Sequence, residues 1–153
     1  MKFIIPIIAV LLFSNQCGQA TDTSNKKNDI SIATQDGMTI TYEAQSRGFY
    51  EKIWVDASGI SFVDNREFDN VRTTPISKAE WEELLAIKNA LHLNTLPKLK
   101  APSENRFSDG AAIGTVTIKT EQDEVKSSEF DHGNPPKELK SLLNKLLSIK
   151  EKL

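Results

Sequence analysis

The stretch FYEKIWVDASGISFV at residues 49–63 decides the fold that this sequence predicts. Apolar and polar side chains alternate in its first part, so Ile53 and Val55 would lie on one side of a strand and Trp54 on the other. A turn-forming sequence at 56–59 separates this strand from a second apolar run at 60–63, which is the pattern of a β-hairpin. We therefore expect two antiparallel strands in this stretch.

The segments around the hairpin extend the predicted sheet. Residues 38–44 (MTITYEA) alternate in the same way, and Gly48 indicates a tight turn or bulge before the hairpin. Residues 66–73 predict a fourth strand. Farther along the chain, residues 112–120 and 125–130 predict two more strands, joined by a short polar turn.

The clearest helix start follows the fourth strand. Ser77 and Glu80 have the spacing of a capping box, and Ile76 and Trp81 have that of a hydrophobic staple. Apolar residues then recur at helical spacing, so we expect a helix that ends near 92–94.

The last segment predicts a second helix. Before it, two prolines in residues 96–109 favour an irregular loop. Asn134 and Pro135 suit the N-cap and the first position of the final helix. One stripe of that helix carries Leu139, Leu142, Leu143, Leu146 and Leu153.

The predicted element order is ββββ-α-ββ-α. Links of hairpin length favour a mostly antiparallel sheet. Two amphipathic helices would cover one face of that sheet, which gives a two-layer α+β fold. The other face is left for solvent or a partner, and Tyr50 and Trp54 are expected to point that way.

The N-terminal residues predict export. A short basic start is followed by an apolar run at 3–13 and a polar exit, which is the pattern of a secretory signal. The run is too short for a permanent membrane span, which needs about 20 apolar residues. Cys17, the only cysteine of the chain, lies where the signal ends.

Two processing routes fit this signal. In the first, cleavage precedes Cys17, which is then acylated and holds the protein on a membrane. In the second, ordinary signal cleavage follows Ala20. We expect the first, because the lone cysteine lies at the end of the apolar signal. The organisation is then a signal peptide at 1–16, a lipidated cysteine and flexible tether at 17–28, and one domain at 29–153. We expect the protein on a membrane of the bacterial cell envelope, and the sequence does not distinguish the inner from the outer membrane.

Composition and motifs exclude several functional classes. The formal net charge is −2 and no long basic block occurs, so nucleic acid is not an expected partner. The two histidines lie forty positions apart and no metal-ligand motif surrounds them, so we expect no metal. No cofactor motif and no catalytic constellation stand out, and we expect no enzyme.

Candidate binding residues occur at two places. Arg47, Phe49 and Tyr50 form a loop that presents one charge and two aromatic rings, which resembles an interface hot spot. Asp131 and His132 lie where a strand leads into a helix, so they indicate either a small anionic or acid/base site or a braced turn.

The remaining candidates lie in the loop before the fifth strand. Arg106 is expected to form an ion pair with Asp131 or Asp109. Ser108, Asp109 and His132 contain the residue types of a hydrolase triad, but no G-x-S-x-G pattern surrounds the serine. Trp54 completes the set of expected binding residues.

Three segments carry a resemblance to known proteins: SRGFYEKIWV, RFSDGAA and FDHGNPPKEL. With the N-terminal signal, the chain resembles small bacterial envelope lipoproteins, which implies a location and no activity. It also resembles the emfourin-like inhibitors of thermolysin-type metallopeptidases. That second resemblance rests on Arg47-Gly48-Phe49, Asp109, Val116-Thr117-Ile118, Phe130-Asp131, Pro135-Pro136 and the leucines of the last helix. It implies a peptidase as partner and assigns no inhibitory residue.

The sequence therefore predicts a non-enzymatic envelope lipoprotein whose domain binds a protein, with a peptidase inhibitor as one form of that function. The alternative is a small hydrolase or small-molecule-binding protein that uses the loop at Asp131 and His132. A measurement of turnover before and after His132→Ala would separate the two.

Overall fold

The computed structural model describes residues 37–153. The predicted signal, Cys17 and the tether lie outside the described residues. The strands are β1 (Thr39–Ser46), β2 (Phe49–Val55), β3 (Gly59–Val63), β4 (Arg72–Pro75), β5 (Ile113–Lys119), β6 (Glu124–Lys126) and β7 (Phe130–Asp131). The α-helices are α1 (Lys78–Asn89) and α2 (Lys140–Lys150), and the 3₁₀ helices are η1 (Leu93–Lys98) and η2 (Asn105–Ser108).

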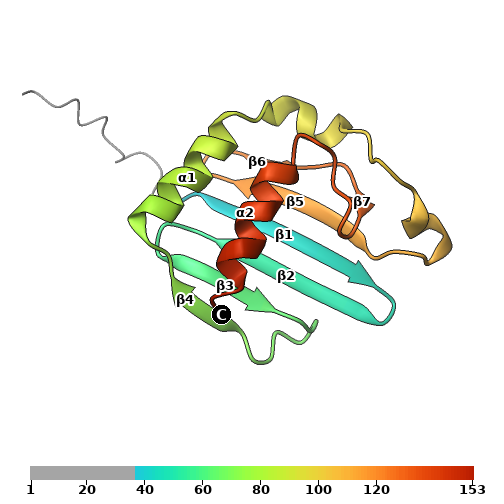
Figure 1. Cartoon of the computed structure of the whole chain (residues 1–153), viewed down its shortest axis with the longest axis horizontal. Helices are drawn as coiled ribbons and strands as arrows, with labels where there is room; N and C mark the ends of the chain where they lie inside the picture. Colours follow the sequence, from blue (N-terminus) through green and yellow to red (C-terminus); the bar gives the residue numbers. More distant parts are fainter. Residues whose placement is uncertain (1–36) are drawn as a thin grey trace, which may run out of the picture. The chain divides into compact units, whose positions relative to one another are not determined.

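The seven strands form one antiparallel sheet with the order β4-β3-β2-β1-β5-β6, and β7 pairs with the start of β5. Both α-helices lie across the same face of this sheet (Figure 1). The predicted α+β fold is therefore confirmed. β1 is a central strand: its Ala44 pairs with Glu51 of β2 on one side and with Gly114 of β5 on the other.

The hydrophobic core lies between the helices and the sheet. Side chains alternate along each strand, and the inward set of β2 contains Ile53 and Val55, which are buried against the leucines of α1 and α2. Trp54 points to the opposite face and is not part of this core. The orientation predicted from the hairpin sequence is therefore correct.

The start of α1 has the predicted capping box. The Ser77 hydroxyl accepts a hydrogen bond from the Glu80 amide at 3.3 Å, and the Glu80 carboxylate accepts one from the Ser77 amide at 3.2 Å. The helix ends at Asn89, earlier than predicted, because a separate 3₁₀ helix begins at Leu93.

The loop predicted at 96–109 is irregular only at 99–104, and the rest of this prediction was wrong. The segment contains the end of η1 and all of η2. Pro97 fits inside η1 because its fixed φ suits a 3₁₀ turn. Leu96 is only 1% exposed, and its carbonyl accepts a hydrogen bond from the Ser128 amide at 2.9 Å. A buried leucine thus ties this segment to the sheet.

The strand predicted at 125–130 is divided into β6 and β7. The Ser127 hydroxyl accepts a hydrogen bond from the Val116 amide at 3.0 Å, and the Ser128 amide donates one to the Leu96 carbonyl. The regular ladder of the sheet is therefore interrupted between β6 and β7. The fourth strand is also displaced: β4 occupies 72–75, while Phe68 and Asn70 in the preceding loop have positive φ values of 58° and 57°.

The helix start predicted at Asn134 and Pro135 was wrong. α2 begins at Lys140 with Leu139 as its N-cap residue. Asn134 instead bridges to Asp131, and its side-chain amide donates to the Ser103 hydroxyl at 2.7 Å. The apolar stripe of α2 is buried as expected at Leu142, Leu143 and Leu146, and Leu153 is partly buried.

Candidate functional site

Asp131 anchors the loop at residues 103–106 through its side chain. Its buried carboxylate accepts hydrogen bonds from the Ser103 hydroxyl at 2.7 Å, the Asn105 amide at 2.8 Å, the Arg106 amide at 3.1 Å and the Arg106 guanidinium at 3.1 Å. The predicted ion pair between Arg106 and Asp131 is therefore confirmed. These bonds fix η2 against the end of the sheet.

The hydrogen bonds also decide the charge of this carboxyl. Burial alone would raise the pKa of Asp131, but the bonds from Ser103, from the amides of Arg106 and Asn105 and from the Arg106 guanidinium outweigh it and lower the pKa to about 2. The group is ionised at neutral pH, and both oxygens already accept hydrogen bonds.

His132 has different neighbours from Asp131. Its Nδ1 lies 2.6 Å from the Tyr42 hydroxyl. Its ring stacks on Tyr42 with 6.0 Å between centroids and lies 5.1 Å from the Phe49 ring. Asp131 and His132 therefore point to different surroundings, as adjacent residues at a strand end do, and the structure does not bring them together as an acid/base pair.

The Ser108 triad is not assembled either. The Ser108 hydroxyl donates to the Asn105 carbonyl at 3.2 Å. Asp109 is exposed and has a left-handed backbone with φ 55°. Among residues 37–153, no hydrogen bond joins either side chain to His132.

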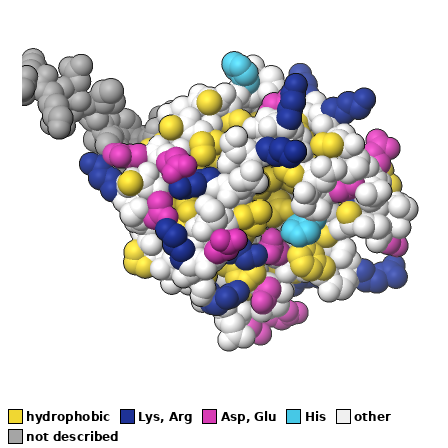
Figure 2. Space-filling model, in the orientation of Figure 1, with side chains coloured by type: hydrophobic (Ala, Val, Ile, Leu, Met, Phe, Trp, Pro, Cys, Tyr) yellow, Lys and Arg dark blue, Asp and Glu magenta, His cyan; other side chains and the backbone are white. Residues whose placement is uncertain are grey.

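The side chain of His132 faces a groove beside α2. A pocket of about 250 Å³ lies between α2, the first two strands and the turn that follows β7. Figure 2 shows hydrophobic surface exposed in the middle of this face. We call this pocket the α2 groove; its lining is Tyr42, Glu51, His132, Gly133, Pro135, Leu143, Asn144, Leu147 and Lys150.

The floor of the α2 groove is polar and fixed. Glu51 is buried and pairs with the ammonium group of Lys150. Burial, and then the negative charge of Glu51, raise the pKa of Tyr42. Its hydroxyl is therefore neutral and can donate to Nδ1 of His132, which leaves Nε2 of the imidazole for a ligand.

The rim of the α2 groove is apolar and exposed. Leu147 on α2 is 39% exposed, and Phe49, which contacts His132, is 37% exposed. Phe49 also lines a shallow pocket of about 290 Å³ together with Arg47 and Tyr50. Three of the predicted binding residues, Arg47, Phe49 and His132, thus gather at one end of the sheet.

Tyr50 and Trp54 lie on the opposite face of the sheet, where they were predicted, but that face is not open at this point. The Phe68 ring lies 6.0 Å from the Tyr50 ring and 6.3 Å from the Trp54 ring. Arg66 holds the same loop down through a 2.7 Å hydrogen bond to the Ser46 carbonyl. These two aromatic residues are therefore not part of the α2 groove.

The sequence interpretation missed Tyr42, Glu51, Leu147 and Lys150. One signal was available: Glu51 stands at an inward position of β2, in phase with Ile53 and Val55. A carboxylate in the core phase of a strand needs a partner, and Lys150 supplies it.

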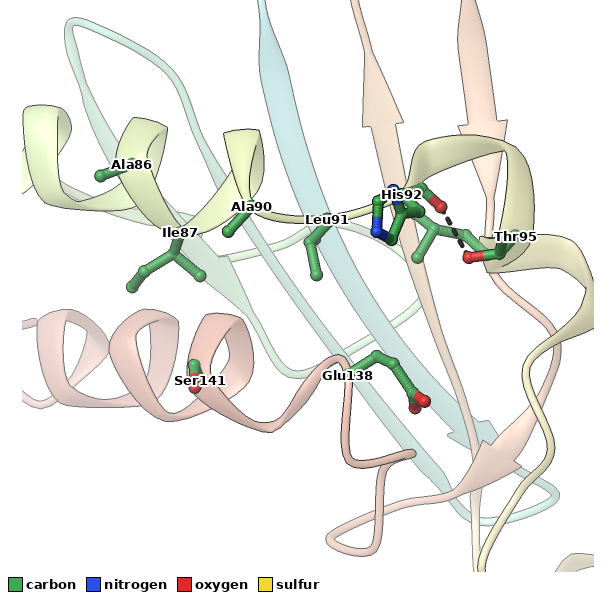
Figure 3. A pocket seen from close by; sticks show the side chains of 9 residues that line it. Ala86, Ile87, Ala90, Leu91, His92, Thr95, Glu138 and Ser141 are labelled. Carbon is green, nitrogen blue, oxygen red and sulfur yellow. Dashed lines mark hydrogen bonds between the residues drawn. The ribbon is translucent and has the colours of Figure 1, made fainter.

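A third pocket lies between the end of α1 and the start of α2. It has a volume of about 460 Å³ and is lined by Ala86, Ile87, Ala90, Leu91, His92, Thr95, Leu96, Glu138 and Ser141. Ile87 near the end of α1 and Leu91 just after it point toward the chain that enters α2 (Figure 3). This lining is mostly aliphatic and contains none of the predicted binding residues.

No protein-family model matches the chain, and no curated protein matches it significantly. Within residues 37–153, no helix combines the length and apolar character needed to cross a membrane. In the same residues, no three His, Cys, Asp or Glu side chains gather as metal ligands.

Proposed function

We propose that this protein is a non-enzymatic, lipid-anchored binding module of the bacterial cell envelope that holds a protein partner in the α2 groove. The observation that carries the proposal is the pair of exposed apolar side chains, Phe49 and Leu147, beside a pocket with a polar floor. Pockets with an apolar rim and a few fixed polar groups are typical of binding sites.

The groove is organised before a ligand arrives. The Tyr42 hydroxyl orients the His132 imidazole, and the ion pair with Lys150 orients Glu51. Binding then costs little side-chain ordering at the floor, which favours affinity. Phe49 supplies the aromatic contact that interface hot spots commonly contain.

A metallopeptidase is the favoured class of partner. This follows from the resemblance to emfourin-like inhibitors, and two of the residues that carry it, Arg47 and Phe49, lie near the groove. The lipid anchor at Cys17 would keep the module at the membrane, where it meets envelope and secreted proteins.

A hydrolase at Asp131 and His132 is the alternative, and the geometry gives it less support. Such an enzyme would need Asp131 to orient the imidazole. The Asp131 carboxylate instead accepts four hydrogen bonds from Ser103, Asn105 and Arg106.

Site-specific photocross-linking in native envelope tests the proposal. A photoreactive amino acid would replace Phe49 or Leu147 in the full chain, with Lys126 on the opposite face of the sheet as the control position. We expect the same protein to be captured from positions 49 and 147 and not from position 126. Capture of one common set from all three positions, or of nothing from the two groove positions, would refute the proposal.

A second experiment addresses the class of partner. When the captured protein is a metallopeptidase, the full chain should lower its activity on a peptide substrate. Leu147→Asp should remove this effect, because it places a charge on the apolar rim. Unchanged inhibition by Leu147→Asp would count against the groove as the inhibitory surface.

A further inference from the structure

A further pocket adjoins the α2 groove at Lys150. It has a volume of about 380 Å³ and is lined by Arg72, Leu147, Lys150, Glu151 and Leu153. Leu147 and Lys150 line both pockets, so the two pockets are neighbours along α2. A ligand longer than a single side chain could contact both.

Two cations meet at one aromatic ring on this surface. The Arg72 guanidinium lies 4.7 Å from the centroid of the Phe62 ring, and the Lys150 ammonium group lies 4.1 Å from it. The ring attracts both charges. It also fixes the position of the guanidinium, whose planar donors suit a carboxylate.

In the described part of the chain, only one of these two cations has a carboxylate partner. Lys150 pairs with the buried Glu51. Within residues 37–153, Arg72 has no carboxylate within 4.0 Å and makes no side-chain hydrogen bond. Glu151 lines the same pocket but forms no ion pair with Arg72. The guanidinium therefore presents its donors to a ligand.

We propose that the α2 groove selects a peptide segment in which an acidic side chain lies close to a large aliphatic one. The carboxylate binds the Arg72 guanidinium beside Lys150, and the aliphatic side chain enters the pocket beside Tyr42, Leu143 and Leu147. This inference rests on the proposed function, because it names the chemistry of the partner at the same site.

The size of the effect follows from the exposure of the pair. A carboxylate on this exposed, ring-supported guanidinium should change affinity by up to about fivefold relative to a neutral side chain. Glu151 would repel the incoming carboxylate, so its removal should strengthen binding by about twofold. The two residues therefore have opposite expected effects.

The test uses capped model peptides and the full chain in a nonionic detergent. The peptides are acetyl-Leu-(Gly)n-Glu-amide with spacers of one to three glycines, and the same series with Lys in place of Glu. Binding is followed by NMR through the backbone amides of Arg72, Leu147 and Lys150. We expect the Glu series to bind more tightly than the Lys series.

Matched variants isolate the charge. Arg72→Gln should remove the preference for Glu, and Glu151→Gln should increase it. Arg66→Gln is the control, because Arg66 also lies over an aromatic ring, that of Tyr50, but on the other face of the sheet. It should leave the preference unchanged.

The outcomes separate this inference from the proposed function. The inference is overturned when the Glu and Lys series bind equally, or when the preference for Glu survives Arg72→Gln. In both cases cross-links from positions 49 and 147 would still support the binding module. Failure of every peptide to bind also overturns the inference. Loss of those cross-links would refute the proposed function itself.

Discussion

At the residue scale, the Asp131 carboxyl contributes to the stability of the protein in acid. Its folded pKa of about 2 lies below the unfolded value of about 3.9. The ionised group therefore stabilises the fold at every pH above about 4, and this contribution is lost as the pH falls through about 2.

Asp131→Asn should remove the contribution of this carboxyl to the pH dependence. The free energy of unfolding of the natural chain, measured by urea denaturation, should fall between pH 4 and pH 2, and the variant should show a smaller fall. Asp109→Asn, in the same loop region, is the control and should keep the natural slope. An equal slope in Asp131→Asn would contradict the assignment.

The contact between Tyr42 and His132 can be tested by a double-mutant cycle. Tyr42→Phe removes the hydroxyl that lies 2.6 Å from Nδ1 of His132. It should lower the free energy of unfolding by about 1 kcal/mol. In a His132→Ala background the same change should have a smaller effect, because the partner is already gone. Additive losses in urea denaturation would mean that the two groups are not coupled.

The candidate site could be predicted from the sequence only in part. Phe49 and His132 were expected from loop position and residue type, and both lie at the α2 groove. Tyr42 and Lys150 were not expected, because a strand residue and a helix residue meet only through the tertiary fold. The ion pair between Arg106 and Asp131 was expected, whereas the hydrogen bond to Asp131 from the Ser103 hydroxyl, 28 positions away in the sequence, was not.

At the element scale, Phe130 of β7 packs directly on the backbone of β5. A Cβ atom added at Gly114 would lie 2.9 Å from the Phe130 ring. Gly114→Ala should therefore force the ring to shift and lower the free energy of unfolding by about 1–3 kcal/mol.

Gly48→Ala is the matched control for this substitution. Nothing lies within 4 Å of a Cβ added at Gly48, so the change should leave stability within about 0.5 kcal/mol. Thermal and urea unfolding of the two variants would compare them directly. Equal stability of the two variants would show that the Phe130 ring tolerates a Cβ atom at position 114.

The elements themselves were predictable where a local pattern fixed them. The hairpin at 49–63 follows from the alternation of apolar and polar residues. The cap of α1 follows from the Ser77 side chain, which bonds to the backbone of its own helix. The division of β6 from β7 was not predictable, because it depends on contacts across the fold, in which Ser127 bonds to Val116 and Ser128 bonds to Leu96. The late start of α2 depends on Asn134 in the same way.

At the scale of the whole molecule, α2 contributes to both stability and the binding surface. Leu146 is fully buried in the core, whereas its neighbour Leu147 is 39% exposed at the groove. Leu146→Ala should lower the free energy of unfolding by about 2–5 kcal/mol. Leu147→Ala should change it by less than about 0.5 kcal/mol.

Leu147→Ala should have a large effect on binding although its effect on stability is small. Urea denaturation reports stability, and the yield of the cross-link from position 49 reports binding. Leu147→Ala should reduce that yield while the chain stays folded. A variant that loses stability and binding together would mean that the groove and the core cannot be separated.

The central position of β1 has a consequence for the time at which the protein can fold. β1 is the first described strand, yet Ala44 and Gly114 must meet before its second edge is paired. A ribosome or a translocation channel delivers β1 long before it delivers β5. The sheet therefore stays incomplete until most of the chain has emerged, because the second edge of β1 has no partner before β5 is available. On the proposed route of export this order is an advantage, since the chain would cross the membrane unfolded and acquire its final shape on the far side.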